Sequence, residues 1–177
     1  MEKNIVLVGF MGTGKSMVGI AVAKKMGRKF IDTDKEIVRN SRMSINEIFE
    51  KYGEDRFRVL ESEVIEKISL EKNLVIATGG GALIQKENVD RLKQNGVLIC
   101  LTASPKEILR RVGGDTNRPI LNVVDKVAMI ERKLEERHRY YALSDISLDS
   151  EKGDVGIIAG DVIKTFLEFV KNGKNRS

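Results

Sequence analysis

Eight residues near the start of the chain, Gly9 to Ser16, combine three glycines with a lysine and a serine in the sequence GFMGTGKS. The spacing matches the pattern G-x-x-x-x-G-K-[ST] at every position. Glycines let backbone N–H groups converge on phosphate oxygens because no Cβ stands in the way. Lys15 would reach the β- and γ-phosphates, and the Ser16 hydroxyl would ligate Mg²⁺. Because the segment follows the apolar run Ile5–Val8 and precedes a helical pattern, it is predicted to bind the phosphates of a nucleotide.

Two carboxylates, Asp32 and Asp34, follow the second apolar run, where the carboxyl end of a parallel strand would face a ligand. In extended backbone, residues two apart point to the same side. One carboxylate would organise Mg²⁺ through water, and the other would accept a hydrogen bond from a substrate hydroxyl. The alternative is structural, with Thr33 or Asp34 capping the next helix. Capping needs only one of these residues, so we favour the functional interpretation.

Arg58 and Glu61 are three residues apart in an amphipathic segment, which makes them neighbours on a helix. Arg58 borders the apolar stripe, so it is a candidate for a partly buried arginine that is held by Glu61 and offers its fork to a carboxylate. The alternative is an ordinary surface ion pair, which stabilises little.

Three successive glycines, Gly79-Gly80-Gly81, come directly after another strand candidate. Glycine destabilises regular elements, so this triplet requires a reason. We expect the close approach of a ligand to the backbone, with a tight strand–helix turn as the alternative.

The segment Gly113–Leu121, GGDTNRPIL, interrupts an otherwise helical region with two glycines and a proline. A surface loop between helices is one interpretation. Glycine hinges and an arginine, Arg118, also suit a mobile lid over an active site. We place this lid at about residues 113–124.

Short apolar runs alternate with amphipathic segments along the whole chain, which predicts a parallel sheet covered by helices on both faces. The predicted strands are Ile5–Val8, Lys29–Ile31, Leu74–Ala77, Val97–Leu101 and Ile146–Leu148. The predicted helices are Ser16–Met26, Ser44–Lys51, Glu54–Leu70, Lys86–Gln94, Pro105–Val112, Val124–Tyr141 and Val155–Val170. The fold class is α/β, and 177 residues suit a single domain.

Composition narrows the functional classes. Lys and Arg exceed Asp and Glu by 31 − 26 = 5, a mild excess, and Trp is absent, which argues against a stacking platform for single-stranded nucleic acid. The single cysteine, Cys100, lies in an apolar run and is expected to be a core residue. A single cysteine cannot form an internal disulfide, which indicates a reducing compartment. No apolar stretch approaches the ~20 residues that span a bilayer, so we expect a cytoplasmic protein.

Other nucleotide-binding classes fit less well. A GTPase switch requires D-x-x-G and N-K-x-D elements, which the sequence lacks, and a motor or transporter ATPase would need a longer chain. A small phosphotransferase remains, with its second substrate close to the phosphate-binding segment.

Taken in order, these stretches resemble shikimate kinase. The resemblance covers nearly the whole chain: GFMGTGKS, the D-T-D of Asp32–Asp34, the F-R-x-x-E around Arg58, the triple glycine, the R-P-I-L of the lid, and Arg137 in a long helix. It implies a three-layer P-loop NTPase fold, with a five-stranded parallel sheet flanked by helices and a shikimate-binding helical region at about residues 33–61. It also implies transfer of the ATP γ-phosphoryl group to the 3-hydroxyl of shikimate, with one Mg²⁺ and ATP as partners of a monomeric enzyme.

The resemblance also implies individual roles. ATP would be held by Gly12, Thr13, Gly14, Lys15, Ser16 and Met17, with Arg118 on the phosphates and Arg111 on the adenine. Mg²⁺ would be bound by Ser16, with Asp32 acting through water. Shikimate would contact Asp34, Arg58, Arg137 and the Gly79–Gly81 turn. Lys15, Asp34 and Arg118 would act in catalysis. The basic excess then reflects anion handling, with neither nucleic acid nor a membrane as a partner.

One departure from the family concerns the string Arg137-His138-Arg139. Family members commonly carry proline where this chain has Arg139, which makes Arg139 a rival of Arg137 for the substrate carboxylate; we favour Arg137. His138, the only histidine, is expected to be a surface residue rather than a catalytic base.

Two alternative functions stay open. A related small-molecule kinase would act on gluconate or on a nucleoside monophosphate. A regulatory nucleotide-binding module would have no use for the set Lys15, Ser16, Asp34 and Arg118.

Overall fold

The structure is a computed structural model that describes residues 2–112 and 125–174, with five parallel strands in one sheet in the order β2-β3-β1-β4-β5. The strands are β1 (Asn4–Val8), β2 (Lys29–Asp32), β3 (Leu74–Ala77), β4 (Gly96–Thr102) and β5 (Ile146–Asp149). The predicted five-stranded parallel sheet is thereby confirmed, and each strand begins and ends within one residue of its predicted bounds. β1 lies in the middle of the sheet, and all five of its residues are buried.

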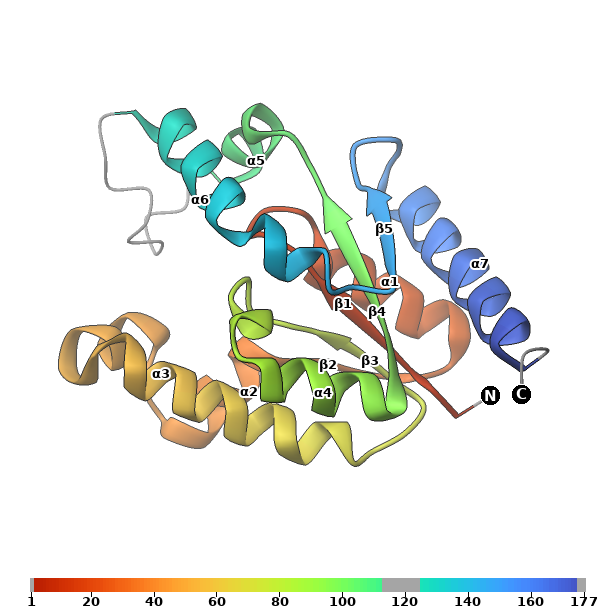
Figure 1. The fold of residues 1–177 in the computed structure, drawn as a ribbon, viewed down its shortest axis with the longest axis horizontal. Coiled ribbons are helices and arrows are strands. Elements are labelled where there is room, and N and C mark those ends of the chain that lie inside the picture. Colours follow the sequence, from red (N-terminus) through yellow and green to blue (C-terminus); the bar gives the residue numbers. More distant parts are fainter. Residues whose placement is uncertain (1, 113–124, 175–177) are drawn as a thin grey trace.

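Helices connect successive strands and cover both faces of the sheet (Figure 1). They are α1 (Lys15–Met26), α2 (Thr33–Ser41), α3 (Ile45–Ser69), the 3₁₀ turn η1 (Ala82–Ile84), α4 (Lys86–Asn95), α5 (Pro105–Val112), α6 (Lys126–Tyr141) and α7 (Val155–Lys174). Val6 and Val8 of β1 pack into the core under α3 and α4, whereas Ile5 and Leu7 face α1 and α7. This alternation along one strand is the reason for the three-layer arrangement, because each face of a parallel sheet must be covered.

The chain around Asp32 differs from the extended backbone that we expected. Asp34 lies in the first turn of α2, a helix absent from the predicted set, so Asp32 and Asp34 do not share one side of a strand. The cap of α2 is Asp32 rather than Thr33 or Asp34, because the Asp32 carboxylate accepts hydrogen bonds from the backbone N–H groups of Asp34 and Lys35. The Asp32 carboxylate is a favourable N-cap, and its hydrogen bonds start a helix where we expected extended backbone.

The two helices predicted at Ser44–Lys51 and Glu54–Leu70 are the two arms of α3. They meet at Gly53, whose φ of 79° and ψ of 176° are not helical. A capping box formed by Ser44 and Glu47 starts the first arm. The kink therefore lets one continuous segment run along the sheet with its second arm and bend away with its first (Figure 1).

The predicted lid, residues 113–124 with Arg118, lies outside the described residues, as does the predicted first residue of the helix at Val124. Among the helices that the structure describes, none is long and apolar enough to cross a membrane.

Candidate active site

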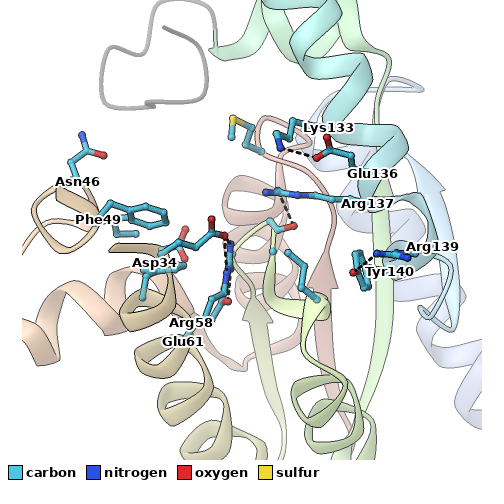
Figure 2. Close-up of a pocket in the computed structure, with 18 of the residues that line it drawn as sticks. Asp34, Asn46, Phe49, Arg58, Glu61, Lys133, Glu136, Arg137, Arg139 and Tyr140 are labelled. Atoms are coloured by element: carbon cyan, nitrogen blue, oxygen red, sulfur yellow. Dashed lines mark hydrogen bonds and ion pairs between the residues drawn. The ribbon is translucent and has the colours of Figure 1, made fainter. Parts of the chain in front are cut away.

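A cavity of about 1090 Å³ lies at the carboxyl edge of the sheet, where parallel α/β folds bind their ligands. Its walls come from α2, α3, the turn after β3, and α6 (Figure 2). Asp34, Arg58, Arg137 and the Gly79–Gly81 turn all line it, so the structure gathers the predicted acceptor-binding residues in one place. Met11 of the phosphate-binding loop reaches the same cavity, which joins the two halves of the predicted site.

The loop from Gly9 to Gly14 wraps around the start of α1. Gly14, at the N-cap of α1, has φ 92° and no side chain with which to cap the helix. The N–H groups of the first turn are therefore oriented to bind an anion. A Cβ at Gly9 would collide with the Leu101 carbonyl oxygen, so this position also requires glycine. The Nζ of Lys15 donates to the carbonyl oxygens of Gly9 and Phe10 at 2.9 and 2.8 Å, which holds the ammonium against the loop.

Ser16 and Asp32 form the candidate magnesium site. The Ser16 hydroxyl donates to the Asp32 carboxylate over 2.6 Å, and the other carboxylate oxygen caps α2. This donation leaves the Ser16 oxygen lone pairs available to a cation. In residues 2–112 and 125–174 no cluster of three or more His, Cys, Asp or Glu side chains could hold a metal. A serine hydroxyl beside a carboxylate fits Mg²⁺, which takes one or two protein ligands together with phosphate oxygens and water.

Arg58 is a partly buried arginine, as predicted. Its side chain is 13% exposed, and its Nη1 lies 2.7 Å from the carboxylate of Glu61, which is 1% exposed. Glu54, one helical turn earlier, accepts from Nη2 at 2.8 Å. Burial alone would lower the pKa of Arg58, but Glu61 and Glu54 together raise it. Burial also raises the pKa of Glu61, and the attraction of Arg58 opposes this rise. Two carboxylates thus fix the direction of one guanidinium.

The triple glycine leaves room for side chains of the site itself. A Cβ at Gly81 would lie 2.5 Å from Nη1 of Arg58, and one at Gly79 would lie 2.7 Å from Glu61 Oε1 and 2.8 Å from Asp34 Oδ1. None of the three glycines is among those with positive φ. Gly79 and Gly81 are therefore required by the close approach of these side chains, where we expected a ligand, and not by backbone conformation. A Cβ at Gly80 would make ordinary contacts, the shortest of them 3.4 Å from Nη1 of Arg137. The tight turn that we gave as the alternative is also present, because the Ala82 N–H donates to the Gly79 carbonyl where η1 begins.

Arg137 and Arg139 both line the cavity but lie differently (Figure 2). The guanidinium of Arg137 extends toward Asp34 and Arg58, lies 5.4 Å from the centre of the Phe10 ring, and donates to the Gly80 carbonyl at 3.3 Å. Arg139 lies beside Tyr140, whose hydroxyl accepts its hydrogen bond at 2.8 Å. The geometry thus favours Arg137 for an anionic group of the acceptor. His138 is exposed, as expected.

Arg111, near the end of α5, is held beside the phosphate-binding loop. Its guanidinium donates to the Gly12 carbonyl at 3.3 Å, to the Ser150 hydroxyl at 3.0 Å and to the Ser150 carbonyl at 2.9 Å, and its Nε donates to Glu107 at 2.6 Å. These bonds fix the orientation of the Arg111 guanidinium next to the phosphate-binding loop. Met17, the last residue of the predicted ATP set, is 62% exposed on α1.

Glu54, Tyr141 and Phe49 lie in or beside the cavity and were not predicted from the sequence. Glu54 could have been found from its spacing of four to Arg58. Tyr141 donates to the Gly80 carbonyl at 2.7 Å, a contact across the fold that no local pattern signals. Phe49 packs against Phe57 with ring centres 5.0 Å apart and forms an apolar wall of the cavity.

Comparison with known proteins gives one consistent result. The sequence model of the family described as shikimate kinase matches residues 11–170. A shikimate kinase of Thermodesulfovibrio yellowstonii is 46% identical over 97% of this chain and 99% of its own, and one of Thermoanaerobacter pseudethanolicus is 44% identical over 96% and 99%.

Solved structures agree with the sequence comparison. A shikimate kinase from Acinetobacter baumannii, described as a complex with shikimate, superposes with a TM-score of 0.90 at 36% identity, covering 94% of this chain and 93% of that one. A gluconokinase from Sinorhizobium meliloti, covering 99% of this chain and 97% of its own, has a TM-score of 0.60 at 18% identity and therefore shares the fold alone. Because the family match and the relatives extend over almost the entire sequence, the chain belongs to the shikimate kinase family.

Proposed function

We propose that the chain transfers the γ-phosphoryl group of ATP to the 3-hydroxyl of shikimate, giving shikimate 3-phosphate on the route to chorismate and the aromatic amino acids. The observation that carries the proposal is the convergence of Asp34, Arg58 and Arg137 around the Gly79–Gly81 turn, in a cavity that also reaches the phosphate-binding loop. Such a cavity offers guanidinium groups to a carboxylate and a carboxylate to a hydroxyl. A hydroxylated carboxylic acid with a single ring fits this chemistry.

Arg58 and Arg137 position the acceptor. Two guanidinium groups on one carboxylate supply directed, charge-assisted hydrogen bonds. Arg58 is rigid because Glu54 and Glu61 both hold it, and Arg137 is directed by Phe10 and the Gly80 carbonyl. Fixing the acid end aims the far side of the ring at the phosphate-binding loop. Positioning of this kind contributes much of the catalysis in phosphoryl transfer.

Asp34 acts on the nucleophile. Its carboxylate lies next to Gly79, close to the position where a Cβ would stand. There it accepts the hydrogen bond of the attacking hydroxyl, orients the oxygen lone pair, and takes the proton as the bond to phosphorus forms.

Lys15 and Arg118 stabilise the charge that spreads over the oxygens of the transferred group. Lys15 comes from the loop described above, whereas Arg118 belongs to residues 113–124, and its role rests on the family resemblance. The Ser16 hydroxyl would hold Mg²⁺, with Asp32 acting through water, and the bound ion would supply further positive charge to the phosphates. The N–H groups from Gly12 to Met17 bind the phosphate oxygens, and Arg111 stacks on the adenine.

ATP and shikimate are the partners that this reaction requires. We propose that the enzyme works as a cytoplasmic monomer and that its excess of five positive charges serves these anions rather than nucleic acid or a membrane.

A coupled ADP-release assay tests the function, with shikimate, gluconate and nucleoside monophosphates offered in parallel to the purified protein with ATP and Mg²⁺. We expect ADP release only with shikimate. Phosphorylation of gluconate or of a nucleotide, without that of shikimate, would reject the proposal and favour one of the alternative kinases.

A further inference from the structure

The Gly80 carbonyl oxygen accepts two hydrogen bonds from one helix. The Tyr141 hydroxyl donates over 2.7 Å and Nη1 of Arg137 over 3.3 Å. Arg137 and Tyr141 are four residues apart on α6 and therefore lie one above the other on the same face. The phenol makes the shorter and stronger of the two bonds.

We propose that Tyr141 is a positioning residue for the acid-binding half of the site: by holding the Gly80 carbonyl, it keeps the Arg137 guanidinium directed into the cavity and the glycine turn in place. The inference rests on the proposed role of Arg137 in binding the substrate carboxylate.

The charges around Arg137 explain why Tyr141 matters as a second hydrogen-bond donor to the Gly80 carbonyl. Arg58 is held by two carboxylates, whereas within the described ranges no carboxylate lies within ion-pair distance of Arg137. The Arg137 guanidinium is oriented by the contact with Phe10, by the Gly80 carbonyl and by the neighbouring Tyr141 hydroxyl. A carbonyl left with one long hydrogen bond would draw the guanidinium toward itself, because an undersatisfied acceptor is costly even in the half-buried position of Gly80. The guanidinium would then have fewer N–H groups for the substrate.

The turn has little freedom to adjust instead. Gly79 and Gly81, on either side of Gly80, lie so close to Asp34 and Arg58 that there is no space for even a methyl group at either position. A small shift of Gly80 therefore reaches both of these side chains. Tyr141 remains a donor throughout the neutral range, because burial raises its pKa to about 12.

The variant Tyr141→Phe removes the hydroxyl and leaves the ring in its packing. We expect the KM for shikimate to rise roughly tenfold, the size of one hydrogen bond, while kcat and the KM for ATP change less than about threefold. Tyr52→Phe is the matched control: it loses the same hydroxyl from a side chain that is 52% exposed on α3, and we expect wild-type values.

A double-mutant cycle separates positioning from general stabilisation. If Tyr141 acts through Arg137, Tyr141→Phe in an Arg137→Met background should change the shikimate KM less than about twofold. An equal rise in both backgrounds, an equal rise in the KM for ATP, or an unchanged KM in the single variant would each overturn the inference, with thermal unfolding confirming that the variants are folded. Failure of the proposed function appears differently, as a wild-type enzyme that releases no ADP with shikimate, and would overturn both.

Discussion

The substitution Gly81→Ala tests the central feature of the site, the packing of a glycine against a guanidinium. The ideal Cβ at this position lies 2.5 Å from Nη1 and 2.6 Å from Nη2 of Arg58, and the guanidinium must retreat by about 1 Å before ordinary contact begins at 3.4 Å. The backbone does not oppose the change, since Gly81 has φ −111°. The cost therefore falls on Arg58 and not on the turn.

Moving the Arg58 guanidinium by this distance would disturb its hydrogen bonds to a bound carboxylate. A misplacement of about 1 Å in a positioning group reduces activity by as much as about 100-fold. The hydrogen bonds of Arg58 to Glu61 and Glu54, at 2.7 and 2.8 Å, would lengthen at the same time. We expect the KM for shikimate to rise about 10- to 100-fold, which corresponds to about 1.4–2.8 kcal/mol of binding free energy. The KM for ATP should stay within about twofold.

Initial rates at saturating ATP with varied shikimate, and the reverse titration, measure both constants. Gly160→Ala is the matched control, because an added Cβ meets no atom within 4 Å there and lies in helix α7. That change should leave both KM values alone and stabilise the protein by roughly 1 kcal/mol. If Gly81→Ala kept its shikimate KM within threefold of the wild type, the requirement for glycine next to Arg58 would be refuted.

Four further predictions concern separate parts of the molecule. Asp34→Asn should lower kcat by roughly 10²- to 10⁴-fold with ATP binding intact in calorimetry, and unchanged turnover would contradict its role. Ser150→Ala removes a hydroxyl that binds Arg111 and should raise the KM for ATP several-fold with no change in that for shikimate; equal effects on both would mean a general loss of structure. Gly53→Ala should lower stability by about 1–3 kcal/mol in denaturant unfolding, because φ 79° with ψ 176° is open to glycine alone; an unchanged midpoint would show that the kink tolerates a side chain. The Cys100 thiol, whose pKa burial raises to about 11, should stay protonated at pH 8 and react with a thiol reagent only as fast as the protein unfolds, so rapid labelling of the native protein would disagree.

The sequence by itself determined the order of the strands and the position of the predicted phosphate-binding loop. Both depend on local signals: short apolar runs predict buried parallel strands, and the spacing from Gly9 to Ser16 predicts a phosphate-binding loop. The ion pair of Arg58 and Glu61 was also predictable, because helical geometry fixes which residues are neighbours. Local reasoning was wrong at Asp32–Asp34, where the competition between strand and helix cap was decided by the hydrogen bonds that one carboxylate accepts.

Only the tertiary structure decided why the three glycines are present and which arginine reaches them. Gly79, Gly80 and Gly81 face side chains from α2, α3 and α6, elements that are distant in sequence and meet only when the sheet is assembled. The choice of Arg137 over Arg139 likewise depends on which face of α6 packs against Phe10 and the Gly80 carbonyl. Short-range periodicity contains no information about such contacts, because they arise from the packing of whole elements and not from the residues beside them.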